Sequence, residues 1–297
     1  MKILSIGNFG HGWDGSICDE LHISNALRDL GHNVWDAQRE LGHDGWSGNP
    51  IFDFTLIAQW DGYTEEMLTG LPRPLVYWAF DYQADGQEWH ERLIKESDLY
   101  LSKRIADSKY PNWQWLSQDF APNFLTEYHD PNGHIIGKHK DIDVLFTGSY
   151  LPWATERNEI LKAVDEKFNL VIHSVNEWPG FKDVRPPIMD DGLPELYARA
   201  KVILSIDHTI EAGYWSDRNA QIMCCGRRPL FRYVPLSEIR FGEHVDYFYD
   251  IEDCLNKVQA RLGVQYEDSF NPYTYALNNL KAKNRVQDLL TIVRSIL

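Results

Sequence analysis

The chain has 297 residues, enough for two domains of about 150 residues each, and its 43% hydrophobic residues supply apolar material for two cores. The formal net charge of −15 argues against a protein that coats nucleic acid or an anionic membrane through its overall field. Four cysteines without a C-x-x-C pair make a disulfide scaffold or structural zinc unexpected, and no apolar run approaches the roughly 20 residues of a membrane-spanning helix. We therefore expect a soluble, cytoplasmic protein without membrane insertion, active as a monomer or homodimer.

The first half of the chain alternates short apolar runs with helical patterns. Residues 2–7 (KILSIG) form a continuous apolar run that ends in glycine, as is typical of a strand buried on both faces. Further strands are expected at 32–37, 52–59, 74–81 and 98–103, and helices at 17–30 and 87–95. The pattern lapses between 122 and 140, a segment rich in Pro, Asn, Gly and His that we interpret as a linker.

The alternation then restarts and continues to the end of the chain. Strands are expected at 141–149, 169–174, 201–208, 228–234 and 245–250, and helices at 156–168, 193–200, 217–225, 251–262 and 275–297. Strands that alternate with helices predict parallel sheets with helical crossovers. We expect an α/β fold with two Rossmann-like domains that face a central cleft. The domains are 1–135 and 141–275, and a C-terminal helix at 276–297 packs back across the cleft.

A glycine-rich loop follows the first expected strand. Gly10, Gly12 and Gly15, with Asp36 about 20 residues further on, match the dinucleotide-binding fingerprint, so a nicotinamide-dependent oxidoreductase is one alternative. The intervening His11, Trp13 and Asp14 are bulky and polar for a pyrophosphate cradle.

Catalytic groups of parallel sheets sit at the ends of strands. A general base that faces the acceptor hydroxyl is therefore expected in this half, and the candidates are Asp81, Asp14 and His11. Gly10, Gly12 and Trp13 are the candidate residues of the acceptor loop. Asp81 has a structural alternative, the capping of the next turn.

Two segments of the second half point to an anionic ligand. Gly148 follows a strand and Arg157 lies early in the next helix, where a guanidinium fork can grip a diphosphate; the alternative is an ion pair with Glu156 or Glu159. In YWSDRNAQIMCCG (214–226), Ser216 or Asp217 is expected to cap a helix whose first turn carries Arg218. A basic residue there opposes the helix dipole, which indicates a phosphate ligand or, alternatively, a salt bridge with a neighbouring acid. The candidate donor site comprises Gly148, Ser149, Arg157, His173, Tyr214, Asp217, Arg218, Gln221 and Gly226.

The second half resembles the CgeB-like glycosyltransferases, a group related to the GT-4 enzymes of GT-B fold. The resemblance rests on DIDVLFTGS, LPELYARAKVILSIDH, YWSDRNAQIMCCG and FGEHVDYFYDIEDCLNKV, covers about residues 141–295, and is looser in the first half. It implies a nucleotide-diphosphate sugar as donor and no obligatory metal, and we expect the donor to be a UDP-sugar with no further cofactor. It places Gly148 and Arg157 near the diphosphate, Arg218 near phosphate or sugar, and Gln221 near the ribose.

The chain departs from this family at two positions. Related enzymes usually have a glutamate in place of Gln221 and another in place of Gly213, and Glu211 lies out of register. A glutamine still donates to and accepts from a ribose hydroxyl, but it lacks the bidentate acceptance of a carboxylate.

These features predict a glycosyltransferase that acts on a hydroxyl acceptor: a small molecule, a glycan or a hydroxymethylated DNA base. The sequence leaves open a nucleotide-sugar-binding module without catalysis. A DNA acceptor would draw on local basic residues, although the net charge opposes it; these residues are Lys103, Arg104, Lys109, Lys138, Lys140, Arg227 and Arg228.

Overall fold

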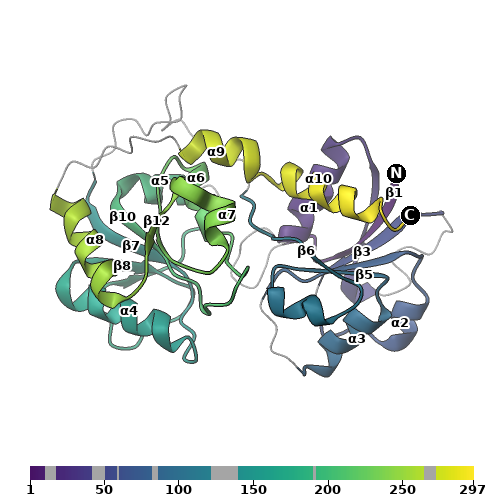
Figure 1. Cartoon of the computed structure of the whole chain (residues 1–297), viewed down its shortest axis with the longest axis horizontal. Coiled ribbons are helices and arrows are strands. Elements are labelled where there is room, and N and C mark those ends of the chain that lie inside the picture. The colour runs from purple at the N-terminus through teal and green to yellow at the C-terminus, as the bar shows by residue number, and fades with distance from the viewer. Residues whose placement is uncertain are drawn as a thin grey trace. The chain divides into compact units, whose positions relative to one another are not determined.

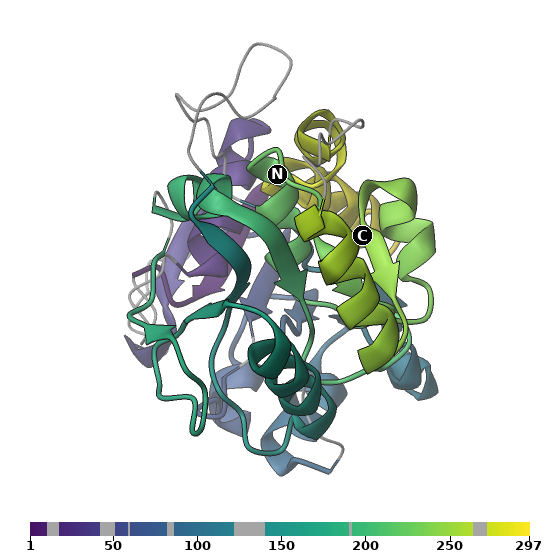
Figure 2. The ribbon, with the colours of Figure 1, turned by 90° about the vertical axis from the view of Figure 1, so that its left-hand side faces the viewer.

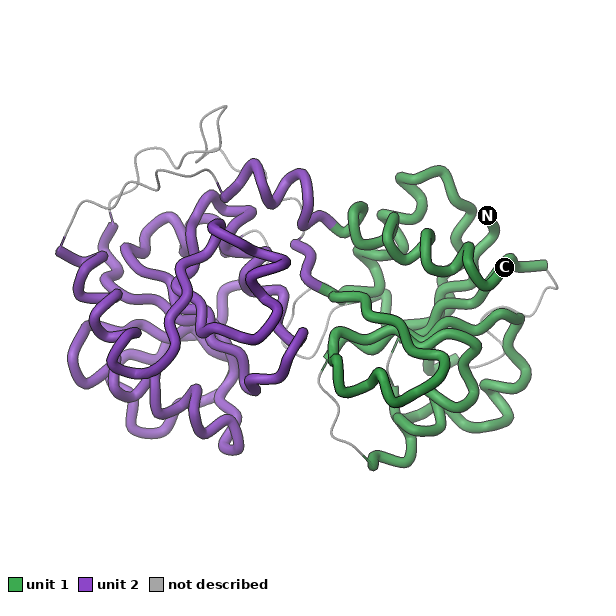
Figure 3. The backbone as a smooth tube through the Cα atoms, viewed as in Figure 1, with its two compact units in different colours: residues 1–118, 282–297 green, residues 119–281 purple. Residues whose placement is uncertain are grey.

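The computed structural model describes residues 1–10, 18–41, 51–58, 60–81, 86–121, 140–189, 192–263 and 272–297. They form two units, one of Met1–Gln118 with Ala282–Leu297 and one of Asp119–Lys281 (Figure 3). The chain thus changes unit at 118–119 and at 281–282, where the sequence analysis placed boundaries at 135–141 and 275–276. Each unit contains a six-stranded sheet in which every pairing is parallel.

Unit 1 is a doubly wound sheet with the strand order β2-β1-β3-β4-β5-β6. Its strands are β1 (Lys2–Gly7), β2 (Asn33–Gln38), β3 (Phe54–Ala58), β4 (Leu75–Trp78), β5 (Leu99–Ser102) and β6 (Trp113–Trp115). Its helices are α1 (Asp19–Asp29), α2 (Glu65–Thr69), α3 (Glu88–Glu96), the 3-10 helix η2 (Ile105–Lys109) and α10 (Ala282–Val293). In Figure 1, α1 and α10 lie side by side above these strands, and α2 and α3 lie below them.

The central strands of unit 1 are buried on both faces, as the apolar runs predict. Every residue of β3, β4 and β5 is buried, because helices cover both faces of the sheet. The side chains of Leu4, Ile6 and Tyr77 point into one core with Leu68 of α2 and Leu93 of α3. The alternate side chains of the same strands face α1 and α10.

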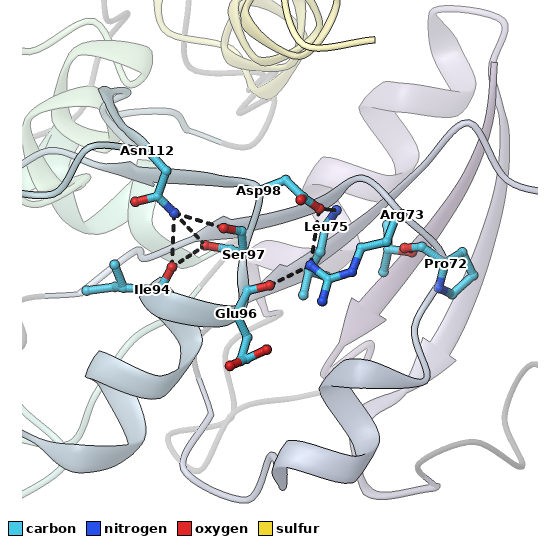
Figure 4. A network of polar contacts seen from close by, with 9 residues as sticks. Pro72, Arg73, Leu75, Ile94, Glu96, Ser97, Asp98 and Asn112 are labelled. Carbon is cyan, nitrogen blue, oxygen red and sulfur yellow. Dashed lines mark hydrogen bonds and ion pairs between the residues drawn. The ribbon is translucent and has the colours of Figure 1, made fainter.

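Polar contacts tie together the amino ends of β4 and β5 (Figure 4). Arg73 donates to the Glu96 carbonyl (2.5 Å) and pairs with Asp98 (3.1 Å), and the Asp98 carboxylate accepts the N–H of Leu75 (2.6 Å). The Asn112 amide donates to the carbonyls of Ile94 and Ser97, both at 2.9 Å. The polar groups at the amino ends of these strands are therefore bonded to one another, which is consistent with a structural role for this part of the sheet.

Unit 2 has the strand order β12-β11-β10-β7-β8-β9. Its strands are β7 (Ile142–Thr147), β8 (Leu170–His173), β9 (Val184–Arg185), β10 (Ala200–Ser205), β11 (Leu230–Arg232) and β12 (Asp246–Phe248). Its helices are α4 (Thr155–Lys167), α5 (Leu193–Arg199), α6 (Arg218–Cys224), α7 (Ser237–Phe241), the 3-10 helix η4 (Gly242–His244), α8 (Ile251–Gly263) and α9 (Pro272–Asn279). Helices α4 and α8 lie side by side and share a core with Val144 and Phe146 of β7 (Figure 2).

The single helix expected at 275–297 is wrong, because the chain forms two helices there. Between α9 and α10 the backbone at Leu280 and Lys281 pairs with an extended segment, and the Ala121 N–H donates to the Leu280 carbonyl (2.9 Å). This carbonyl therefore serves a strand-like bridge instead of continuing the helix. The break is also the point at which the chain leaves unit 2 for unit 1.

Candidate functional site

The sheet of unit 2 has a topological switch point between β7 and β10. These strands pair with each other, but the chain proceeds from β7 to β8 on one side and later adds β10 on the other. In parallel sheets, ligands bind outside the carboxyl ends of the strands at such a point. The residues that follow β7 and β10, from Gly148 and from Ile206, therefore form the candidate site.

Arg218 spans this switch point. Its Nε donates to the carbonyl of Thr147 at the end of β7 (2.9 Å), and its Nη1 donates to the carbonyl of Ile206 just after β10 (3.2 Å). The guanidinium lies 5.0 Å from the centre of the Phe146 ring. Within the described part of the chain, Nη2 has no hydrogen-bond acceptor. The side chain is thus fixed by both strands and keeps one donor group for a ligand.

Gly148 makes room for this arginine. Its backbone has φ +153°, and a methyl group in place of its hydrogen would lie 3.0 Å from Arg218 Nη2 and 3.2 Å from the Phe146 ring. The Gly148 N–H donates to the carbonyl of His173 (3.0 Å), and its carbonyl accepts the indole N–H of Trp178 (3.1 Å). Both the backbone conformation and the limited space therefore favour a glycine at this position.

The loop after Gly148 follows a fixed path. The Asn176 side chain accepts the N–H of Tyr150 (2.7 Å) and donates to its carbonyl (2.9 Å), as a paired strand would. Asn158 of α4 donates to the carbonyl of Leu151 (2.9 Å). These contacts fix the backbone of Ser149 beside the switch point.

Arg157 is a second, buried guanidinium at this site. Its Nη2 donates to the Ser149 carbonyl (2.8 Å), and the group lies 5.5 Å from the centre of the Trp178 ring. Its Nε has no partner among the described residues. Burial, together with the charge of Arg218, lowers the pKa of Arg157 to about 10, so the group stays protonated at neutral pH.

The alternative ion pair for Arg157 does not form. Its expected partner Glu156 instead binds Arg232, at 2.8 Å. The second expected partner, Glu159, is exposed, whereas Arg157 is buried. The unit therefore presents two neighbouring arginines near one glycine loop, an arrangement suited to a polyanionic group.

His173 ends β8 next to this loop. Its Nδ1 lies 2.7 Å from the carbonyl of Pro186, and because a carbonyl only accepts, Nδ1 carries the proton. Burial lowers the pKa of His173, which makes the neutral form prevail at pH 7. Nε2 is then a hydrogen-bond acceptor.

The segment 214–226 is arranged differently from the sequence expectation. Helix α6 begins at Arg218, and neither Ser216 nor Asp217 caps it with its side chain. Asp217 instead accepts a hydrogen bond from the Gln221 amide (2.5 Å). Arg218 is accounted for by strand carbonyls and by an ion pair with Asp207 (3.7 Å), one of the alternatives that the sequence left open.

Tyr214 and Gly226 have partners within unit 2. Buried Tyr214 has its hydroxyl 3.2 Å from Nε2 of His208, whose ring contacts exposed Trp153. Gly226 has φ +72°, its N–H donates to Met223, and the next N–H, of Arg227, donates to Ile222. This is the Schellman arrangement that ends a helix, so helix termination explains the glycine without a ligand.

Only some of the candidate residues of unit 1 lie within the described part of the chain. Asp81 lies exposed beyond β4, and Gly10 is exposed after β1. His11, Gly12, Trp13, Asp14 and Gly15 lie outside the described residues. Asp36, the acid of the dinucleotide fingerprint, pairs with Arg28 at 2.6 Å.

Sequence reasoning missed two carboxylates at the carboxyl ends of the strands. Glu20 of α1 covers Gly7 at the end of β1 and accepts the N–H of Asn8 (3.3 Å). Burial, with a smaller effect of the Asp81 charge, raises the pKa of Glu20. Asp207 is buried beside Arg218; the sequence analysis included it in a strand, although an acid directly after an apolar run was the available signal.

Most of the basic residues proposed to contact DNA do not form a basic surface patch, because they are buried or paired. Lys103, Arg104 and Arg227 are buried, where they bind Gln118, Asp107 and the Lys201 carbonyl, respectively. Arg228 pairs with Asp246 at 3.3 Å. Lys103, Arg104 and Arg227 are buried and bonded inside the protein, so they cannot neutralise phosphates, and the half-buried Arg228 is already paired. Lys109 is exposed, Lys140 is half-buried, and Lys138 lies outside the described residues.

Comparisons with known proteins give one family match and several similar folds. Residues 157–268 match a family model described as glycosyl transferase-like, and no curated protein matches the chain. An alpha-glucosyltransferase in complex with UDP and a 13-mer DNA has TM-score 0.67 and 12% identity, over 99% of this chain and 100% of that chain. The DNA-modifying enzyme beta-glucosyltransferase has TM-score 0.64 and 14% identity, over 99% of both chains.

Sucrose-phosphate synthase from Thermosynechococcus elongatus is also similar, with TM-score 0.66 and 9% identity over 99% of this chain and 98% of that chain. The fold is therefore GT-B, with two Rossmann-like α/β domains. Within the described ranges, no helix is long and apolar enough to cross a membrane.

Proposed function

We propose that this chain is a glycosyltransferase that takes its sugar from a nucleotide-diphosphate sugar, and that it belongs to the CgeB-like group. The observation that supports this best is the position of Arg218. It bridges β7 and β10 at the switch point with Nη2 directed at Gly148, next to the second guanidinium of Arg157. A diphosphate placed over Gly148 and Ser149 meets both cations.

The chemistry of transfer favours such a pair. When the bond between the sugar and the diphosphate breaks, negative charge develops on the leaving phosphate oxygen. Prepositioned guanidinium groups stabilise that charge without having to reorganise. We propose that Arg157 and Arg218 supply this stabilisation and that no metal is needed.

The donor is proposed to be a UDP-sugar. Solved structures of the same fold contain UDP or were determined with uridine diphosphoglucose, which supports the choice. His173 Nε2 is suited to accept from a sugar hydroxyl, and the Gln221 carbonyl from a ribose hydroxyl, while its amide stays bound to Asp217. We propose that Ser149, Tyr214 and Asp217 complete the donor site.

The acceptor side is assigned to unit 1. Asp81 and Glu20 lie close enough for the charge of Asp81 to affect the pKa of Glu20, so two carboxylates lie near the ends of β1 and β4. We propose Asp81 as the base that receives the proton of the acceptor hydroxyl. A hydroxymethylated DNA base is one acceptor to test, because the alpha-glucosyltransferase of similar fold was solved with DNA.

Calorimetric titration with UDP-, GDP- and ADP-glucose, followed by a donor-hydrolysis assay, tests the proposal. We expect binding of UDP-glucose and slow release of glucose. Absence of binding to every donor at millimolar concentration would refute the proposal. Binding without any turnover, with or without acceptors, would favour a nucleotide-sugar-binding module, and binding of NADH would favour the oxidoreductase.

A further inference from the structure

Asp207 lies behind the two arginines without reaching the surface. Its side chain is 1% exposed, and its Oδ1 is 3.7 Å from Nη1 of Arg218. The same oxygen accepts the backbone N–H of Ser216 (3.1 Å). The other oxygen, Oδ2, is buried and has no hydrogen-bond partner among the described residues.

The position of Asp207 makes it the shared counter-charge of the two arginines. The positive charge of Arg218 lowers the pKa of Arg157, and the negative charge of Asp207 raises it, so all three charges interact. Charges buried this deeply are screened little by salt or water. The site thus has two positive charges and one negative charge before any ligand binds.

We propose that the Asp207 carboxylate weakens the binding of the free nucleoside diphosphate to the two arginines, so that the product leaves after transfer. This inference rests on the proposed function. When the sugar–oxygen bond breaks, the bonding electrons stay on the terminal phosphate, so the product carries more negative charge than the donor. A fixed carboxylate behind the arginines repels the product more strongly than it repels the donor.

Two other roles are less consistent with the geometry. A direct hydrogen bond from Asp207 to a sugar hydroxyl requires access, which a side chain exposed by 1% does not have. A purely structural role predicts that neutralising Asp207 lowers stability without strengthening ligand binding. The orientation of Arg218 survives neutralisation, because the Thr147 and Ile206 carbonyls also hold it.

The test is calorimetric titration of the full chain with UDP and with UDP-glucose. Asp207→Asn removes the charge and keeps an oxygen for the Ser216 N–H. We expect the dissociation constant for UDP to fall by at least about tenfold, and that for UDP-glucose to fall less. In the hydrolysis assay, UDP becomes a stronger product inhibitor, and both kcat and KM fall because the release of UDP is slower.

The matched control is Asp141→Asn, which neutralises a carboxylate paired with Arg199 at the amino edge of the same sheet and leaves UDP binding unchanged. Asp207→Ser, checked by thermal unfolding, repeats the experiment if the asparagine variant does not fold. Unchanged or weaker UDP binding by a folded Asp207 variant overturns this inference alone. Failure of the wild type to bind UDP or any sugar nucleotide refutes the proposed function instead.

Discussion

Arg218 and Gly148 occupy complementary space: the guanidinium Nη2 lies where a methyl group on residue 148 would come within 3.0 Å. The arginine comes from α6, whereas the glycine follows β7, 70 positions earlier in the chain. The two meet because the backbone carbonyls of Thr147 and Ile206 bind the guanidinium. The preference for glycine at position 148 therefore depends on Arg218, a residue far away in the sequence.

Gly148→Ala tests this relationship. The added methyl group meets Arg218 and Phe146 in a strained backbone, so we expect the free energy of unfolding to fall by about 2–4 kcal/mol, and UDP binding to weaken. Gly180→Ala is the control, because Gly180 has φ +82° with open space around it and loses only the backbone term, about 1–2 kcal/mol. Urea unfolding of both variants measures the difference. Equal losses would show that the contact with Arg218 has no cost.

Arg218→Lys keeps the positive charge but loses the planar guanidinium group with its several N–H donors. A lysine cannot hold both strand carbonyls while it also faces a diphosphate, so we expect the dissociation constant for UDP to rise about 10- to 100-fold. Arg199→Ala serves as control, since its partner Asp141 lies at the amino edge of the sheet. Undiminished UDP affinity in Arg218→Lys would remove the arginine from the donor site.

Gly226→Ala separates helix termination from ligand binding. An alanine in the left-handed conformation costs about 1–2 kcal/mol of unfolding free energy. Because the glycine N–H already serves the end of α6, we expect UDP affinity to stay the same. A large loss of UDP affinity in a folded variant would show that Gly226 is part of the donor site.

His173 makes stability depend on pH. Its pKa is lowered in the folded chain, so as the pH falls below about 6.5 the unfolded chain binds a proton first. The free energy of unfolding therefore decreases as the pH falls from about 6.5 to the pKa of His173 in the folded chain. Above and below this pH range, the contribution of His173 to stability is constant. Urea unfolding at pH 5 to 8 should show a shallower decline in His173→Asn than in the wild type. An unchanged slope would show that folding does not lower the pKa of His173.

The sequence predicted the two sheets because their central strands are buried on both faces and read as unbroken apolar runs, such as KILSIG and KVILSI. The short strand β6 and helix α2 carry no such run, and the sequence analysis missed them. The break between α9 and α10 depends on pairing with Ala121, a partner far away in the sequence.

The donor site also depends on contacts between residues that are far apart in the sequence. Arg157 and Arg218 were identified as candidates, but the reason offered for Arg218, an uncompensated helix dipole, is not the one that the structure gives. Thr147 ends β7, whereas Ile206 and Asp207 follow β10, so only the tertiary fold brings these three residues together around Arg218. The role of Gly148 was predicted from its place after a strand, whereas its contact with Arg218 was not predictable from spacing.

A crystal structure of the chain soaked with UDP tests the central claim most directly. We predict diphosphate oxygens within hydrogen-bond distance of Arg218 Nη2, over the Gly148–Ser149 backbone, at the switch point between β7 and β10. A nucleotide bound instead at the loop after β1, or a diphosphate without contact to Arg218 and Arg157, would contradict the account.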